Sequence, residues 1–205
     1  EYGDGGGIYC QFSSPRIVNC NLLNNETDGS AGGFYCWGNG SSPILENCVF
    51  YQNSTGGYGG GLVCENSHLK LTGCSFNSNS AYHRGGAIYL IETSALIEDC
   101  QVTGNSAIEG GGIFLAVSDS TVLRNCIIQE NYSEFGGSSL NCQHSLLNMI
   151  GCQISVNSSD LGDAMSFDSH SNPVLIDCAI FDNTGYGLAV GDSSSSIMYG
   201  CHIYD

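Results

Sequence analysis

A cysteine returns along this chain at a nearly constant interval, and that interval constrains the fold more than any other feature. The spacings between eight successive cysteines are 28, 26, 26, 26, 26, 26 and 23 residues. We call them the cysteine ladder: Cys20, Cys48, Cys74, Cys100, Cys126, Cys152, Cys178 and Cys201. A period of this length is typical of chains built from stacked repeats, each too small to bury its apolar side chains alone.

Three further positions repeat in phase with the cysteine ladder. The residue two places after each ladder cysteine is apolar, as at Phe50 and Ile128, and the residue directly before it is Asn, Gly or Asp. An asparagine stands five places after seven of these cysteines. At a coil corner it tolerates left-handed backbone geometry, and its amide can bond to equivalent amides above and below. We therefore expect a buried asparagine ladder of Asn25, Asn53, Asn79, Asn105, Asn131, Asn157 and Asn183.

A second motif begins with paired glycines, as in Gly60-Gly61-Leu62-Val63-Cys64. Paired glycines indicate another corner, where a positive φ or close backbone approach excludes a Cβ. Each repeat thus holds three short alternating segments between turn residues, the pattern of strands and not of helices. Stacked strands would pair in parallel at about 4.8 Å. We predict one domain over residues 1–205, an all-β parallel β-helix of about eight coils with three short sheets.

The combined motif resembles the repeats of a known group of proteins. Cys48-Val49-Phe50-Tyr51-Gln52-Asn53 followed by Gly60-Gly61-Leu62 is similar to the repeats of bacterial right-handed parallel β-helix proteins. These include the polymorphic outer-membrane adhesins, whose repeats carry FxxN and GGA[ILV] motifs. The resemblance covers essentially the whole chain and implies a right-handed coil. It leaves the function open, because the pectate-lyase-like superfamily also holds pectate lyases, polygalacturonases and phage tailspikes.

Charge and cysteine content restrict the partners and the location. Four Lys and Arg against 20 Asp and Glu give a net charge of −16, which repels nucleic acids and anionic membranes. No apolar run reaches the roughly 20 residues of a membrane span. We expect no nucleic-acid partner and no membrane insertion. Twelve cysteines without a CxxC pair favour an oxidising extracellular or cell-surface location.

The cysteines allow two interpretations. Alternation places the ladder cysteines inward, where they act as small buried hydrophobes. The four remaining cysteines precede a ladder cysteine by 10 or 12 residues, which also allows within-coil disulfides, with pairing between coils as the competing connectivity. The within-coil pairs would be Cys10–Cys20, Cys36–Cys48, Cys64–Cys74 and Cys142–Cys152.

The sequence offers no catalytic site that we can identify. Lyases of this fold pair an Arg or Lys base with calcium held by Asp clusters, and the inverting hydrolases use facing carboxylates. The basic residues here are Arg16, Lys70, Arg84 and Arg124, none near an Asp cluster at coil spacing. His144 and His170 lie 26 residues apart with Asp168 nearby, a weak metal candidate that we interpret as solvated loop residues. We expect no cofactor, with calcium as the one alternative.

One set of outward positions predicts a contact surface. Between the two inward residues of each glycine-led strand stand Tyr9, Tyr35, Val63, Tyr89 and Phe114. Stacking would align them into an exposed aromatic stripe, suited to lateral packing on another chain or to binding sugar rings. The alternative is that these rings stack across strands and only strengthen the sheet.

The chain begins at Glu1 and stops at Asp205 inside a repeat, without a capping helix. We expect either an excerpt of a longer solenoid or copies that self-associate head-to-tail into a filament. The leading hypothesis is a structural or adhesive extracellular rod without catalysis. The alternatives are a polysaccharide-processing β-helix enzyme, either lyase or glycosidase, and a calcium-dependent glycan-binding module.

Overall fold

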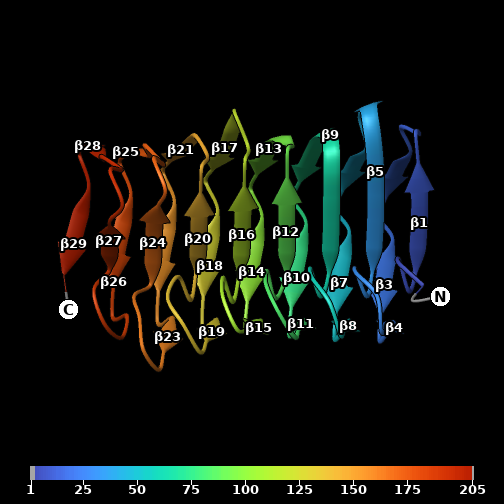
Figure 1. Ribbon diagram of the computed structural model, residues 1–205, viewed down its shortest axis with the longest axis horizontal. Helices are drawn as coiled ribbons and strands as arrows, with labels where there is room; N and C mark the ends of the chain where they lie inside the picture. The colour runs from blue at the N-terminus through green and yellow to red at the C-terminus, as the bar shows by residue number, and fades with distance from the viewer. Residues whose placement is uncertain (1–2, 205) are drawn as a thin grey trace.

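The chain winds into a parallel β-helix, as its repeats predict. The computed structural model describes residues 3–204, which form 29 strands and no helix. The coils stack along the long axis, from β1 at the N-terminal end to β29 at the C-terminal end (Figure 1). Eight strands in one sheet correspond to eight coils, so the predicted all-β class and coil number are confirmed. Glu1 and Asp205, on which the head-to-tail prediction rests, lie outside the described residues.

A 15-stranded sheet covers two faces of the rod, which we call face A and face B, and the long strand β9 runs along both. Face A consists of β1 (Ile8–Gln11), β5 (Phe34–Ser41), β9 (Leu62–Thr72), β12 (Ile88–Ile91), β16 (Ile113–Ala116), β20 (Leu140–Gln143), β24 (Met165–Asp168) and β27 (Leu188–Val190). Face B adds β2 (Arg16–Val18), β6 (Ile44–Glu46), β13 (Ser94–Glu98), β17 (Thr121–Arg124), β21 (Leu147–Ile150), β25 (Val174–Ile176) and β28 (Ile197–Tyr199).

Two further parallel sheets complete the coil. The eight-stranded sheet C holds β3 (Asn21–Leu23), β7 (Val49–Tyr51), β10 (Ser75–Asn77), β14 (Gln101–Thr103), β18 (Ile127–Gln129), β22 (Gln153–Ser155), β26 (Ala179–Phe181) and β29 (His202–Tyr204). The six-stranded sheet D holds β4 (Glu26–Thr27), β8 (Ser54–Thr55), β11 (Ser80–Ala81), β15 (Ser106–Ala107), β19 (Tyr132–Ser133) and β23 (Ser158–Ser159).

The predicted asparagine ladder is confirmed, and it lies at the corner between sheets C and D. Asn105 Nδ2 donates to Asn131 Oδ1 at 2.9 Å and to the carbonyl oxygen of Phe76 at 3.0 Å. The same pattern links every neighbouring pair from Asn25 to Asn183. The five central asparagines are buried, and the two at the ends of the ladder are half-buried. Each side-chain amide thus provides hydrogen bonds to polar groups of the two neighbouring coils. It does so at a corner where no strands pair to provide them.

The left-handed backbone lies elsewhere than the sequence predicts. The ladder asparagines have no positive φ; the residue directly before each one has, from Asn24 (φ 54°) to Asp182 (φ 53°). The residue directly before each ladder cysteine is also left-handed, from Asn19 (φ 54°) to Gly200 (φ 62°). Left-handed geometry favours Asn, Asp and Gly, which explains the restricted choice before each cysteine.

The glycine pairs reflect close approach between coils as well as positive φ. Gly85 has a φ of 66°. Gly61 does not, but a Cβ there would lie 2.8 Å from the carbonyl oxygen of Ala87 in the next coil. Inside the coils, apolar columns fill one continuous core, where the rings of Phe50 and Phe76 stack at 4.4 Å between centroids. The packed interior leaves the outer faces and the loops as the places for function.

Candidate functional site

The predicted aromatic stripe is aligned but not exposed, so the prediction of a contact surface there is wrong. Parallel register joins Tyr9, Tyr35, Val63, Tyr89 and Phe114 in one column on face A. Tyr9 is 49% exposed, whereas Tyr89 is 7% exposed and Phe114 is fully buried, with Tyr35 and Val63 buried as well. The column therefore presents no continuous apolar surface to solvent.

Segments that precede the strands of face A cover this column. The Tyr58 ring stacks on Tyr89 at 5.0 Å between centroids, and the Arg84 guanidinium lies 4.7 Å from the centre of the Phe114 ring. Arg84 Nε also lies 2.9 Å from Glu109 Oε2. The result is a second, smaller core outside the sheet, in which Tyr89 and Phe114 stack at 5.6 Å. Burial raises the pKa of Tyr89 above its usual value.

None of the four within-coil disulfides is present, and all twelve cysteines are free thiols. The reason is geometric: the two cysteines of one coil belong to different parts of the coil, and cysteines meet across neighbouring coils instead. Cys10, Cys36 and Cys64 stand in register on β1, β5 and β9. The six central ladder cysteines, from Cys48 to Cys178, are buried in the core. Burial raises the pKa of the Cys142 thiol to about 12.

The structure brings the two candidate histidines together without a third ligand. The rings of His144 and His170 lie 6.3 Å apart between centroids, and both side chains are exposed. Asp168 Oδ2 instead accepts a hydrogen bond of 2.8 Å from Ser166 Oγ. Within residues 3–204, no three His, Cys, Asp or Glu side chains are grouped so that they could hold a metal ion.

Three of the four basic side chains form ion pairs. Arg16 pairs with Glu46 at 2.8 Å, Arg124 pairs with Glu98, and the third is the Arg84–Glu109 pair. Each of these three cations faces a glutamate of a neighbouring coil.

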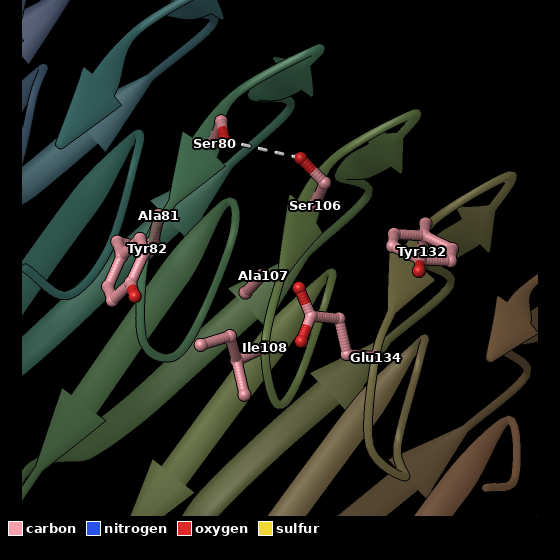
Figure 2. Close-up of a pocket in the computed structure, with 8 residues that line it drawn as sticks. All are labelled: Ser80, Ala81, Tyr82, Ser106, Ala107, Ile108, Tyr132 and Glu134. Atoms are coloured by element: carbon pink, nitrogen blue, oxygen red, sulfur yellow. Dashed lines mark hydrogen bonds between the residues drawn. The ribbon is translucent and has the colours of Figure 1, made fainter. Parts of the chain in front are cut away.

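A groove on sheet D, which the sequence did not single out, is the best candidate for a binding site. Ser80, Ser106 and Tyr132 lie in register on β11, β15 and β19, and Ser106 Oγ donates to Ser80 Oγ at 3.3 Å. Figure 2 shows the Tyr82 and Tyr132 rings at the two ends of the groove. The groove has a volume of about 200 Å³ and is lined by Ser80, Ala81, Tyr82, Ser106, Ala107, Ile108, Tyr132 and Glu134.

The lining of this sheet D groove combines aromatic faces with hydrogen-bonding groups. Tyr82 is 65% exposed, and the Glu134 carboxylate lies between the two tyrosine rings (Figure 2). The Tyr132 hydroxyl donates to Asp160 Oδ2 at 2.8 Å, which holds the phenol in place. This bond raises the pKa of Tyr132. The groove can therefore offer ring faces, serine hydroxyls and a carboxylate to one ligand.

The stacked parallel coils, with their asparagine ladder and paired-glycine corners, define a β-helix repeat protein. A family model described as "Right handed beta helix region" matches residues 1–95 and 86–205, and the chain belongs to this family. No curated protein and no solved structure matches the chain. Among the described residues, no helix is long and apolar enough to cross a membrane.

Proposed function

We propose that this chain serves as a structural or adhesive extracellular rod whose sheet D groove binds an extended, neutral glycan. The observation that carries the proposal is the open groove lined by Tyr82, Tyr132, two serine hydroxyls and Glu134. The resemblance of the repeats to those of polymorphic outer-membrane adhesins agrees with an adhesive role. Because all twelve cysteines are free thiols, the extracellular location in this proposal rests on that resemblance and not on disulfides.

The spacing and rigidity of the groove suit a polymer that lies along the rod. Tyr82 and Tyr132 belong to coils two apart, which places them about 10 Å from each other along the axis at a strand spacing of about 4.8 Å. Tyrosine rings provide apolar faces for sugar rings, with hydroxyl groups at their edge. Because hydrogen-bonded strands hold the backbone of Ser80 and Ser106, little flexibility is lost on binding. A net charge of −16 disfavours acidic polymers, which supports a neutral glycan over an acidic one.

A binding assay with matched variants tests this proposal. The rod is passed over immobilised neutral β-glucan, mannan and acidic galacturonan, as wild type and as Tyr82→Ala and Tyr132→Ala. We expect binding to a neutral polymer and a loss of about tenfold or more in each variant, as for an exposed aromatic at the centre of an interface. Tyr51→Ala is the control, because Tyr51 is exposed on sheet C. An equal loss in all three variants, or no binding at all, would contradict the proposal.

Assays with the same polymers also test the two alternative functions, polysaccharide processing and calcium-dependent glycan binding. Release of reducing ends, or of unsaturated products absorbing in the ultraviolet, would assign the chain to the polysaccharide-processing enzymes. Binding that disappears with a calcium chelator and returns with added calcium would identify a calcium-dependent glycan-binding module.

Face B supports a second candidate role, lateral self-association with another copy of the chain. It carries three of the four basic residues, Arg16, Lys70 and Arg124, against the two carboxylates of Glu46 and Glu98. The rest of the molecule is strongly acidic, so face B of one copy is electrostatically complementary to the remaining surface of another.

An apolar hollow beside Lys70 provides surface that a second copy of the chain could bury in this contact. It has a volume of about 410 Å³ and includes Leu96 and Val122, which point outward from β13 and β17. Sedimentation velocity should show dimers or larger species that dissociate in Leu96→Glu and at high salt. Thr103→Glu, on sheet C, is the control. A monomer at all concentrations would rule out this contact.

A further inference from the structure

The cysteine ladder places free thiols one above another through the core. Cys48, Cys74, Cys100, Cys126, Cys152 and Cys178 are buried in successive coils, with no other residue type interrupting the column. Four of the six sulfurs donate to a carbonyl of the preceding coil, as Cys74 Sγ does to Leu45 at 3.5 Å and Cys126 Sγ to Ile97 at 3.4 Å. Cys100 Sγ and Cys178 Sγ donate instead to the carbonyl two residues earlier in their own coil. The backbone N–H of Cys74 in turn donates to Cys100 Sγ at 3.4 Å.

We propose that this column binds soft, two-coordinate monovalent cations such as Cu(I) or Ag(I), each held between the sulfurs of two successive coils. Thiolates select soft metal ions over harder ones. A zinc–thiolate bond is about 2.3 Å long, and two metal–thiolate bonds of similar length in a straight line span about 4.6 Å. This length matches the coil spacing of about 4.8 Å, so an ion fits between neighbouring sulfurs without moving the coils.

The same geometry disfavours a disulfide and a structural zinc site, the two usual roles of paired cysteines. A disulfide brings its Cβ atoms to about 3.8 Å, closer than stacked coils place them, so it would strain sheets held by parallel hydrogen bonds. A structural zinc ion needs four ligands in a tetrahedron. The column supplies two sulfurs to each gap, and within residues 3–204 no group of three or more candidate ligands occurs.

Binding leaves the buried site uncharged, which the apolar core requires. Each monovalent cation displaces one thiol proton: the S–H bond of one cysteine breaks, an S–metal bond forms, and the proton leaves to solvent. The sulfur of the next coil coordinates through a lone pair. Nothing is oxidised or reduced, and the thiolate charge cancels that of the cation.

A metal titration with two single-cysteine variants tests the proposal. The full chain, reduced with a phosphine, is titrated with Ag(I) and separately with Cu(I), following sulfur-to-metal charge-transfer absorption and the bound ions by native mass spectrometry. Cys100→Ala interrupts two successive gaps, towards Cys74 and Cys126, and should lower the loading by about two ions. Cys142→Ala is the matched control, because Cys142 is equally buried but stands in register with Leu115 and Phe167.

The expected result is several ions per wild-type chain, unchanged loading in Cys142→Ala, and two sulfur neighbours per ion by X-ray absorption spectroscopy. If circular dichroism shows that Cys100→Ala is misfolded, Cys126→Ala replaces it, because this variant also interrupts two successive gaps between ladder sulfurs. Absence of loading in the folded wild type, an equal loss in Cys142→Ala, or three to four sulfurs around each ion would overturn the proposal.

Discussion

Replacement of Asn105 by alanine should cost the rod about 4 kcal/mol of unfolding free energy, although it removes only one amide. The Asn105 side chain donates to Asn131 Oδ1 at 2.9 Å and to the Phe76 carbonyl at 3.0 Å, and its Oδ1 accepts the Asn79 backbone N–H at 2.8 Å. In Asn105→Ala the N–H of Asn79 loses this acceptor inside the protein, which costs about 1–3 kcal/mol. The other lost bonds add about 1 kcal/mol each.

Urea denaturation followed by circular dichroism measures this loss, with Asn77→Ala as the control. Asn77 is half-buried on sheet C, and its side chain accepts one hydrogen bond of 2.7 Å from Ser78 Oγ. Its replacement should change the unfolding free energy by less than about 0.5 kcal/mol, as for an ordinary surface position. If Asn105→Ala costs no more than this control, the asparagine ladder does not hold the corner, and our account of the coil is wrong.

Three further predictions concern the covered column, the coil contacts and a half-buried carboxylate. Tyr89→Ala should lower the unfolding free energy by about 3–5 kcal/mol, because Tyr89 is buried in the second core, whereas an effect near zero would mean that the column is exposed. Gly61→Ala should lower the thermal midpoint, since its Cβ would lie 2.8 Å from the Ala87 carbonyl oxygen, and an unchanged midpoint would show that the coils can separate there. Burial raises the pKa of Glu65, so the folded state binds its proton more tightly than the unfolded chain does; stability should fall as pH rises through the interval from the usual carboxyl pKa to the raised one. Glu65→Gln should flatten that part of the stability profile, and an identical profile in the variant would contradict this assignment.

The repeat made the fold and the asparagine ladder predictable because both depend on one period. A residue that returns with each coil must stack on its own equivalents, so Asn53 and Asn79 meet whatever the intervening loops do. The preference for Asn, Gly or Asp before each ladder cysteine was also visible in the sequence. Its cause, a left-handed residue at that corner, needed the backbone.

The wrong predictions concern solvent exposure and cysteine pairing, which the alternation and spacing of residues along the chain do not determine. Alternation shows that Tyr89 points away from the main core, but not that Tyr58 returns to cover it. Spacing along the chain likewise suggested the Cys36–Cys48 pair, although parallel register sets Cys36 beside Cys64. The sheet D groove was missed for the opposite reason: Tyr82 and Tyr132 occupy different positions of their repeats, so no periodic signal marks them.

The direction of the backbone hydrogen bonds has a mechanical consequence. Bonds such as Ser75 N–H to the Cys48 carbonyl, 2.9 Å long, join one coil to the next and point along the rod. Tension applied between the two ends therefore pulls the coils apart a few bonds at a time instead of shearing a whole sheet at once. The rod should yield in steps, and each peeled coil of about 26 residues would release about 90 Å of extended chain, so that a stretched molecule lengthens gradually and keeps its remaining coils intact.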